Sequence, residues 1–173
     1  MLNESACGWM IALLAIAGTI VAADDWKSFQ FAEDRFAIDL PEAPVITNRG
    51  FDPETMVRTR QYYVGIKSYT FIVSATLFRH EAREQIGGDE GLLRLLINIF
   101  VANCASHRER TILVPGATAR EISAENCERG PATIARYYFV DDWLYQVTVV
   151  GPTGMGSSIE TQHFMESFRI IGK

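Results

Sequence analysis

The sequence predicts an α+β fold, a layered structure in which helices cover a mostly antiparallel sheet. Two observations lead to this prediction. Short segments of apolar and β-branched residues follow one another with only turn residues between them, which is typical of antiparallel strands. Two further segments have helical character, one in the middle of the chain and one near its end. With 173 residues, 48% of them hydrophobic, the chain is long enough for one domain with a substantial core.

The first half of the chain predicts three strands. Residues 35–41 alternate apolar and polar side chains and end at Pro41, after which residues 41–53 read as a loop. A second strand over 58–66 and a third over 69–78 are joined by a turn. Both faces of the third strand are largely apolar or neutral, so we expect it to be central and covered on both sides.

The second half predicts a helix, further strands and a last helix. Asp89 caps a helix that extends to about Cys104, and its apolar circumference indicates deep packing on the sheet. Ser157-Ser158-Ile159-Glu160 is a capping box that starts the last helix. No repeat or linker interrupts residues 24–173, so they form one domain. The strands expected here are 108–114, 118–123, and a hairpin of 132–140 with 143–150 that turns at Asp141-Asp142.

The first 23 residues read as a signal peptide. No charged residue occurs from Ser5 to Ala23, and the apolar run ends in small residues before Asp24, which favours cleavage between Ala23 and Asp24. We therefore expect a periplasmic or secreted protein. Left uncleaved, the same segment would anchor the domain in the inner membrane. No Lys or Arg precedes the apolar run, so a start at Met10 or further upstream stays open.

Cleavage would remove Cys7 and leave Cys104 and Cys127, an even number in an oxidising compartment. A disulfide between them would close a loop of about 22 residues and contribute roughly 3 kcal/mol. Two separate buried thiols are the alternative, since Cys104 falls on the apolar face of the predicted helix.

Motifs that suggest chemistry each have a simpler structural explanation. His80-Glu81-Ala82-Arg83-Glu84 begins like a zinc-protease helix but has Glu where the second His is needed. The glycine-rich loop 151–158 lacks the Lys of a phosphate-binding loop. The remaining histidines, His107 and His163, have no metal-ligand spacing. We therefore predict no catalytic, cofactor-binding or metal-binding residue.

Aromatic residues gather around the predicted hairpin and give the strongest functional indication in the sequence. Core packing is the ordinary explanation for such a cluster. Its exposed part would be a partner surface, because Tyr and Trp are favoured anchors of protein interfaces. The residues of this candidate partner surface are Tyr137, Tyr138, Trp143 and Tyr145.

The order of four segments resembles the PsbP-like domains, relatives of the extrinsic photosystem II protein that include many small exported bacterial proteins. The segments are 35–41, 118–122, 143–149 and 164–169, and the resemblance extends over about residues 30–171. It implies an α-β-α sandwich and a role in binding or assembly. Two departures are Arg35 and Ala119, which stand where these domains often have Gly.

Three hypotheses for function follow. The first is a non-enzymatic periplasmic protein that binds another protein or an envelope assembly. The second is a small-ligand carrier with a cavity between sheet and helices, and the third is a metal-dependent or hydrolytic enzyme. A net charge of −5 and scattered Arg residues argue against a nucleic-acid partner.

Overall fold

The computed structural model describes residues 26–49, 53–54, 56–128 and 130–172. The predicted signal peptide (residues 1–23) and its cleavage site therefore lie outside the described residues. Within the described ranges, no helix is long and apolar enough to cross a membrane.

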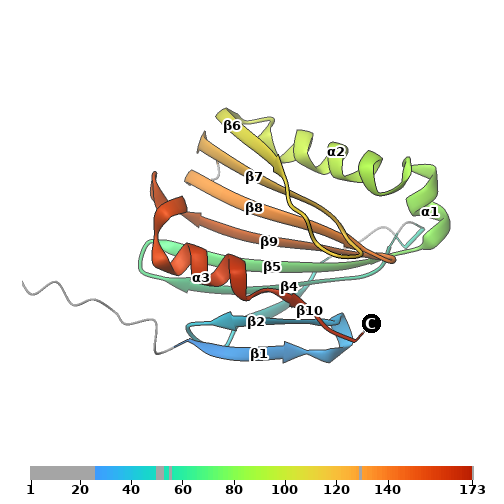
Figure 1. Ribbon diagram of the computed structural model, residues 1–173, viewed down its shortest axis with the longest axis horizontal. Coiled ribbons are helices and arrows are strands. Elements are labelled where there is room, and N and C mark those ends of the chain that lie inside the picture. The colour runs from blue at the N-terminus through green and yellow to red at the C-terminus, as the bar shows by residue number, and fades with distance from the viewer. Residues whose placement is uncertain (1–25, 50–52, 55, 129, 173) are drawn as a thin grey trace, which may run out of the picture.

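Seven antiparallel strands form the large sheet (Figure 1). Its strands are β3 (Val45–Asn48), β4 (Met56–Ile66), β5 (Tyr69–Phe78), β6 (Cys104–Thr111), β7 (Thr118–Cys127), β8 (Gly130–Val140) and β9 (Trp143–Gly151). They are ordered β3-β4-β5-β9-β8-β7-β6, so β9 pairs with both β5 and β8 at the centre. The predicted turn at Asp141-Asp142 joins β8 to β9, with Asp141 at φ 54° as a tight hairpin requires.

A small sheet packs below the large one in Figure 1. It consists of β1 (Lys27–Phe31), β2 (Phe36–Leu40) and β10 (Arg169–Ile170), with β2 in the middle. A short 3-10 turn, η2 (Ala32–Asp34), joins β1 to β2. Because β10 lies near the C-terminus, the two ends of the described chain meet in this sheet.

The helices lie on opposite faces of the large sheet. The helix α2 (Gly88–Val101), preceded by α1 (His80–Gln85), packs through Leu93 and Ile97 in one cluster with Ile122 and Tyr137. The other face is covered by the small sheet and by α3 (Ile159–Ser167), whose Phe164 lies beside Phe71. The 3-10 turn η3 (Met155–Ser157) precedes α3, and Ser158 caps that helix by accepting from the Thr161 N–H.

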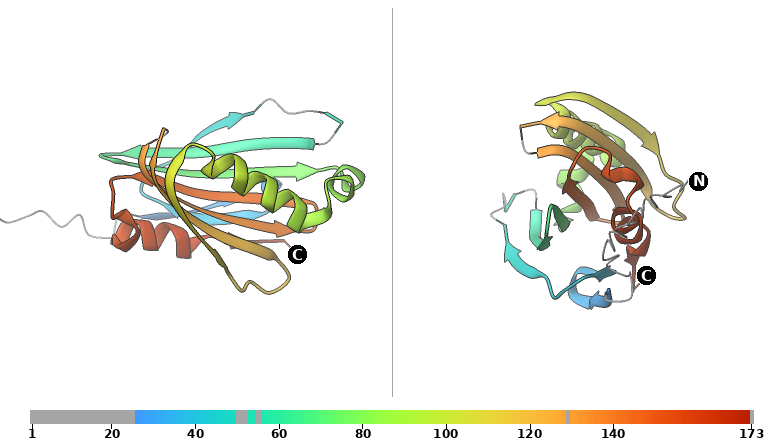
Figure 2. Two further views of the ribbon diagram at one scale, coloured as in Figure 1. Left: turned by 90° about the horizontal axis from the view of Figure 1, so that it is seen from above. Right: turned by 90° about the vertical axis from the view of Figure 1, so that its left-hand side faces the viewer.

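Coverage of the large sheet is uneven, which corrects the expectation that helices cover both sides. On the α3 face of β5, Phe71, Val73 and Ala75 are buried. On the α2 face of the same strand, Ile72 and Ser74 are only half-buried. Figure 2 (left) shows why: α2 lies over the orange strands, and β3 and β4 extend beyond it. The strand β5 is therefore central in the sheet and buried along its α3 face, but on the α2 face it is buried only near Thr76 and Phe78.

Element boundaries differ from the sequence prediction at several places, among them β6 (Cys104–Thr111, expected over 108–114) and β7 (Thr118–Cys127, expected over 118–123). The α2 helix ends at Val101, and Cys104 begins β6 instead of continuing the helix, because Cys104 pairs in register with Cys127 of β7. The strands β1 and β3 were not expected. Both are short edge strands with mostly exposed side chains, and such strands carry little hydrophobic pattern.

One buried carboxylate joins the small sheet to the large one. Asp34, at the end of η2, is fully buried, and its Oδ1 lies 2.7 Å from an Arg58 guanidinium nitrogen on β4. Its Oδ2 accepts a hydrogen bond from the Tyr62 hydroxyl and lies 3.5 Å from Arg60. Buried ionised carboxylates persist when they are paired and hydrogen-bonded. Asp34 is paired with both arginines, and its hydrogen bond comes from Tyr62 to Oδ2, while Oδ1 has the ion pair with Arg58 alone.

Arg35 occupies a backbone conformation that favours Gly. Its backbone has φ 54° and ψ 37°, the left-handed conformation, and it turns the chain from η2 into β2. A side chain in this region costs about 1 kcal/mol relative to Gly.

We predict that Arg35→Gly raises the free energy of unfolding by about 0.5–1 kcal/mol, because Gly adopts the left-handed turn without steric cost. Arg35→Val should lower stability instead, since a β-branched residue is poorly accommodated at positive φ. Urea denaturation followed by tryptophan fluorescence measures both. Equal stability of the Gly and Val variants would contradict the explanation.

Candidate functional site

The predicted aromatic partner surface is wrong, because all four side chains are buried. Tyr137 lies under α2 with its ring 6.3 Å from that of Phe100. On the other face, Tyr138 stacks on Phe168, Tyr145 lies tilted against the same ring at 5.5 Å, and Trp143 stacks on Tyr145 at 5.9 Å. Tyr138, Trp143 and Tyr145 belong to the core between the two sheets, and Tyr137 belongs to the core under α2, so none of the four side chains forms an exposed surface.

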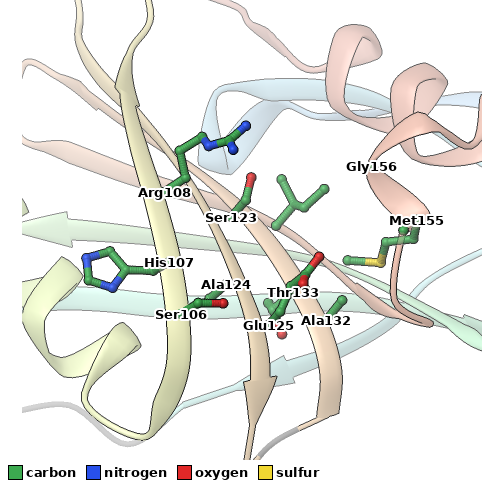
Figure 3. Close-up of a pocket in the computed structure, with 12 residues that line it drawn as sticks. Ser106, His107, Arg108, Ser123, Ala124, Glu125, Ala132, Thr133, Met155 and Gly156 are labelled. Carbon is green, nitrogen blue, oxygen red and sulfur yellow. The ribbon is translucent and has the colours of Figure 1, made fainter.

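An open groove lies instead where β6, β7 and β8 meet the loop before α3, with a volume of about 400 Å³ (Figure 3). Two rows of side chains cross it on the α3 face. In the first row, Arg108 stands opposite Ser123, and Ser123 stands opposite Ile134.

The second row of the groove lies two residues further along each strand, on the same face of the sheet. In it Ser106 stands opposite Glu125, and Glu125 stands opposite Ala132. The first row thus carries a cation and the larger aliphatic residue, and the second an anion and the smaller one.

The glycine-rich loop forms the wall of this groove. Gly154 has φ 81°, and a Cβ placed on Gly156 would lie 3.1 Å from the Ile134 Cδ1 atom. Glycine therefore lets the loop come close to β8, and Met155 is buried between the loop and the sheet. The structure thus uses this loop to approach the sheet closely as well as to cap α3.

Both charges of the groove, Arg108 and Glu125, are exposed and stand apart from the other charges of the described residues. Within the described ranges, no hydrogen bond or ion pair is formed by the Arg108 guanidinium or the Glu125 carboxylate. The adjoining Glu121, by contrast, lies 2.6 Å from Arg110 Nε and 2.7 Å from Arg136 Nε. Burial of Glu121 opposes its ionisation, but the hydrogen bonds from the two arginines lower its pKa below 4.5 overall.

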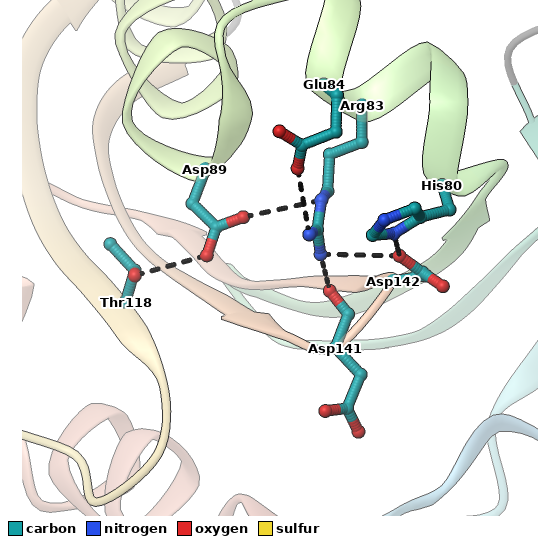
Figure 4. Close-up of polar contacts among 7 residues, drawn as sticks. All are labelled: His80, Arg83, Glu84, Asp89, Thr118, Asp141 and Asp142. Atoms are coloured by element: carbon teal, nitrogen blue, oxygen red, sulfur yellow. Dashed lines mark hydrogen bonds and ion pairs between the residues drawn. The ribbon is translucent and has the colours of Figure 1, made fainter.

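Arg83, from the segment that resembles a zinc-protease helix, ties α1 to the β8–β9 turn (Figure 4). Its guanidinium donates to the Asp141 carbonyl and lies 3.3 Å from Asp142 and 3.7 Å from Asp89. His80 lies 3.1 Å from the same Asp142 carboxylate. Across the described residues, no group of three His, Cys, Asp or Glu side chains is arranged to hold a metal. The contacts of this cluster hold α1 against the β8–β9 turn.

Ser167, His163 and Asp39 lie near one another but not in the order of a catalytic triad. His163 Nε2 is 3.2 Å from Asp39 Oδ2, and the Asp39 backbone N–H donates to Ser167 Oγ. The Ser167 hydroxyl donates to the Phe164 carbonyl, so it is not directed at the imidazole. The third histidine, His107, lies on β6.

Cys104 and Cys127 form a disulfide, with their α-carbons 4.0 Å apart. They occupy directly opposite positions on β6 and β7, so the bond fastens the edge strand to its neighbour. It lies at the end of the two strands that carry Arg108 and Glu125.

The second candidate site is an exposed apolar ridge on α2, formed by Leu95 and Ile99, which are 48% and 58% exposed. They are four residues apart and so lie on one flank of the helix. Glu90, on the other flank, hydrogen bonds to Arg120 of β7. The ridge therefore faces away from β7, toward the open half of the sheet over β9, β5 and β4. This ridge could not be recognised from the sequence, because α2 is apolar over most of its circumference.

Comparisons with known proteins identify the fold. The solution structure of cyanobacterial PsbP (CyanoP) from Synechocystis sp. PCC 6803 superposes with a TM-score of 0.56, covering 91% of this chain and 98% of that one. The chain has a PsbP-like fold. Sequence identity is 12%, so the similarity concerns the fold alone. No protein-family model and no curated protein sequence matches the chain.

We predict that Glu121→Gln lowers the free energy of unfolding by about 1–2 kcal/mol at pH 7, because Arg110 and Arg136 lose a charged acceptor. Since the folded pKa lies below 4.5, the contribution of Glu121 is present above that pH and is lost as the pH falls further. The difference between variant and wild type should therefore shrink in acid. Denaturation at pH 7 and pH 3 measures this.

Glu125→Gln on the same strand is the matched control, because Glu125 has no partner among the described residues. Its stability should follow the wild type at both pH values. A Glu121→Gln difference that stayed constant with pH would argue against the assigned pKa shift.

Proposed function

We propose that this protein is an exported, non-enzymatic binding protein that docks a helix of another envelope protein on the open half of its large sheet. The observation that carries the proposal is the ridge of Leu95 and Ile99, two large apolar side chains exposed beside an uncovered sheet face. Exposed apolar patches of this kind are typical of interaction sites.

The dimensions of the open face favour a helix as the occupant. Strands in a sheet lie about 4.8 Å apart, so β9, β5, β4 and β3 together span about 15 Å. A helix with its side chains is about 10 Å wide. One further helix beside α2 would cover this half of the face and would bury the ridge on its flank.

The chemistry of the face indicates an apolar and neutral stripe on that helix. Side chains directed to this face from β4, β5 and β9 are uncharged, and Tyr63 is 37% exposed. A hollow of about 360 Å³ includes Tyr63 and Ile72, with Arg49 at its margin hydrogen-bonded to Gln61. The neutral residues of the open face are Thr59, Gln61, Tyr63, Thr70, Ile72, Ser74 and Gln146.

Export to the periplasm or beyond is part of the proposal. It is supported by the apolar segment that ends at Ala23, by the disulfide between Cys104 and Cys127, and by the PsbP-like fold. A disulfide is stable in oxidising compartments and rare in the cytosol.

We expect Leu95→Glu combined with Ile99→Glu to abolish capture of the partner, because a charged residue on the ridge would be buried against an apolar helix. The measurement is crosslinking followed by affinity purification from the envelope fraction of the producing cell. Bands present with the wild type and absent with the double variant mark the partner.

Leu113→Glu provides the matched control. Leu113 is an apolar residue with 94% exposure in the loop between β6 and β7, away from the ridge. Capture should survive this change, and circular dichroism verifies that each variant folds. If the double variant captures the same proteins as the wild type, the ridge is not the docking site.

A further inference from the structure

From the groove at β6–β8 we infer a second binding site, specific for a short peptide with a free amino terminus and a free carboxyl terminus. This site lies on the α3 face of the large sheet, opposite the ridge on α2, so it is independent of the proposed helix docking. Its basis is a cavity of ligand-binding size in which two opposite charges have no partner among the described residues.

The two rows of the groove separate the charges that such a peptide carries. Arg108 presents a guanidinium, a planar group with two parallel donors for a carboxylate, and Ser123 beside it adds a hydroxyl. In the other row Glu125 presents a carboxylate for an ammonium group, with the Ser106 hydroxyl opposite. A ligand with only one charge would leave the second charge of the groove unmatched.

The distance between Arg108 and Glu125 indicates a dipeptide or a slightly longer ligand. Residues on diagonal positions of neighbouring strands have β-carbons about 7–8 Å apart, and Arg108 and Glu125 are related in this way. Two extended residues span about 7 Å. The termini of a dipeptide can therefore reach both side chains at once.

The apolar part of the groove determines the order of the two residues in the bound dipeptide. Ile134 belongs to the row of Arg108, and buried Met155 lies on the loop above it, so an aliphatic side chain fits at the carboxyl end. Ala132 belongs to the row of Glu125 and leaves room at the amino end. The geometry points to a small residue followed by an aliphatic one, for which Ala-Leu is the simplest probe.

The test is a titration of the full mature protein with Ala-Leu, followed by chemical shifts of backbone amides on β6, β7 and β8. We expect saturable binding at concentrations up to about 10 mM, which corresponds to a weak but specific site. N-acetyl-Ala-Leu, which lacks the ammonium, and Ala-Leu amide, which lacks the carboxylate, should each bind about threefold or more weakly.

Variants connect each terminus to its residue. Arg108→Ala should abolish the difference between Ala-Leu and its amide, and Glu125→Ala should abolish the difference between Ala-Leu and its acetylated form. Arg94→Ala, an exposed arginine on α2, is the control and should leave all three affinities unchanged.

Two results would overturn the inference. One is the absence of saturable shifts with Ala-Leu in a protein whose spectrum is that of the folded state. The other is equal affinity for the acetylated and free peptides, which would make the groove a site for simple carboxylates. Neither result bears on helix docking at Leu95 and Ile99, which the capture experiment tests separately.

Discussion

The buried carboxylate of Asp34 is the interaction on which the arrangement of the layers depends. It accepts contacts from Arg58, Arg60 and Tyr62, all on β4, and it belongs to the turn that joins β1 to β2. Buried charge is costly unless its partners are all in place, so this set of contacts allows one position of the small sheet. Burial and the bond to Asp34 also raise the pKa of the Tyr62 hydroxyl, which keeps it protonated as a donor.

The small sheet determines which surfaces of the protein are free. Together with α3 it closes one face of the large sheet, where Phe36, Phe71 and Phe164 form the core. A single long helix then has to cover the opposite face, and it reaches only part of it. The part of this face beside Leu95 and Ile99 stays open because α2 does not extend over it. The groove follows from the loop that enters α3, because Gly154 and Gly156 bring it close to β8.

Sequence patterns predicted the parts of the fold that hydrophobic burial determines. The strand over 69–78, the Asp141-Asp142 hairpin and the capped last helix lie where they were expected, because each has a strong local signal. Cys104 was assigned to the wrong element because it follows an apolar helix with no glycine or proline to end it. The aromatic cluster was a candidate partner surface with core packing as the ordinary alternative, and burial decides for the core, because Tyr138 and Tyr145 are covered by Phe36 of β2 and by Phe168, which are distant in sequence. The groove residues Arg108 and Glu125 could not be recognised from the sequence. They become neighbours only through the pairing register of β6 and β7.

The measurement that tests this account most directly is hydrogen exchange of the Asp34→Asn variant compared with the wild type. The substitution preserves size but removes the charged acceptor that Arg58, Arg60 and Tyr62 share, a loss of about 1–3 kcal/mol because both arginines stay partly solvated. The account predicts that amides of β1 and β2 lose protection, while those of β7 and β8 stay close to the wild type. Uniform loss of protection across both sheets, or no loss in β1 and β2, would contradict the role assigned to Asp34.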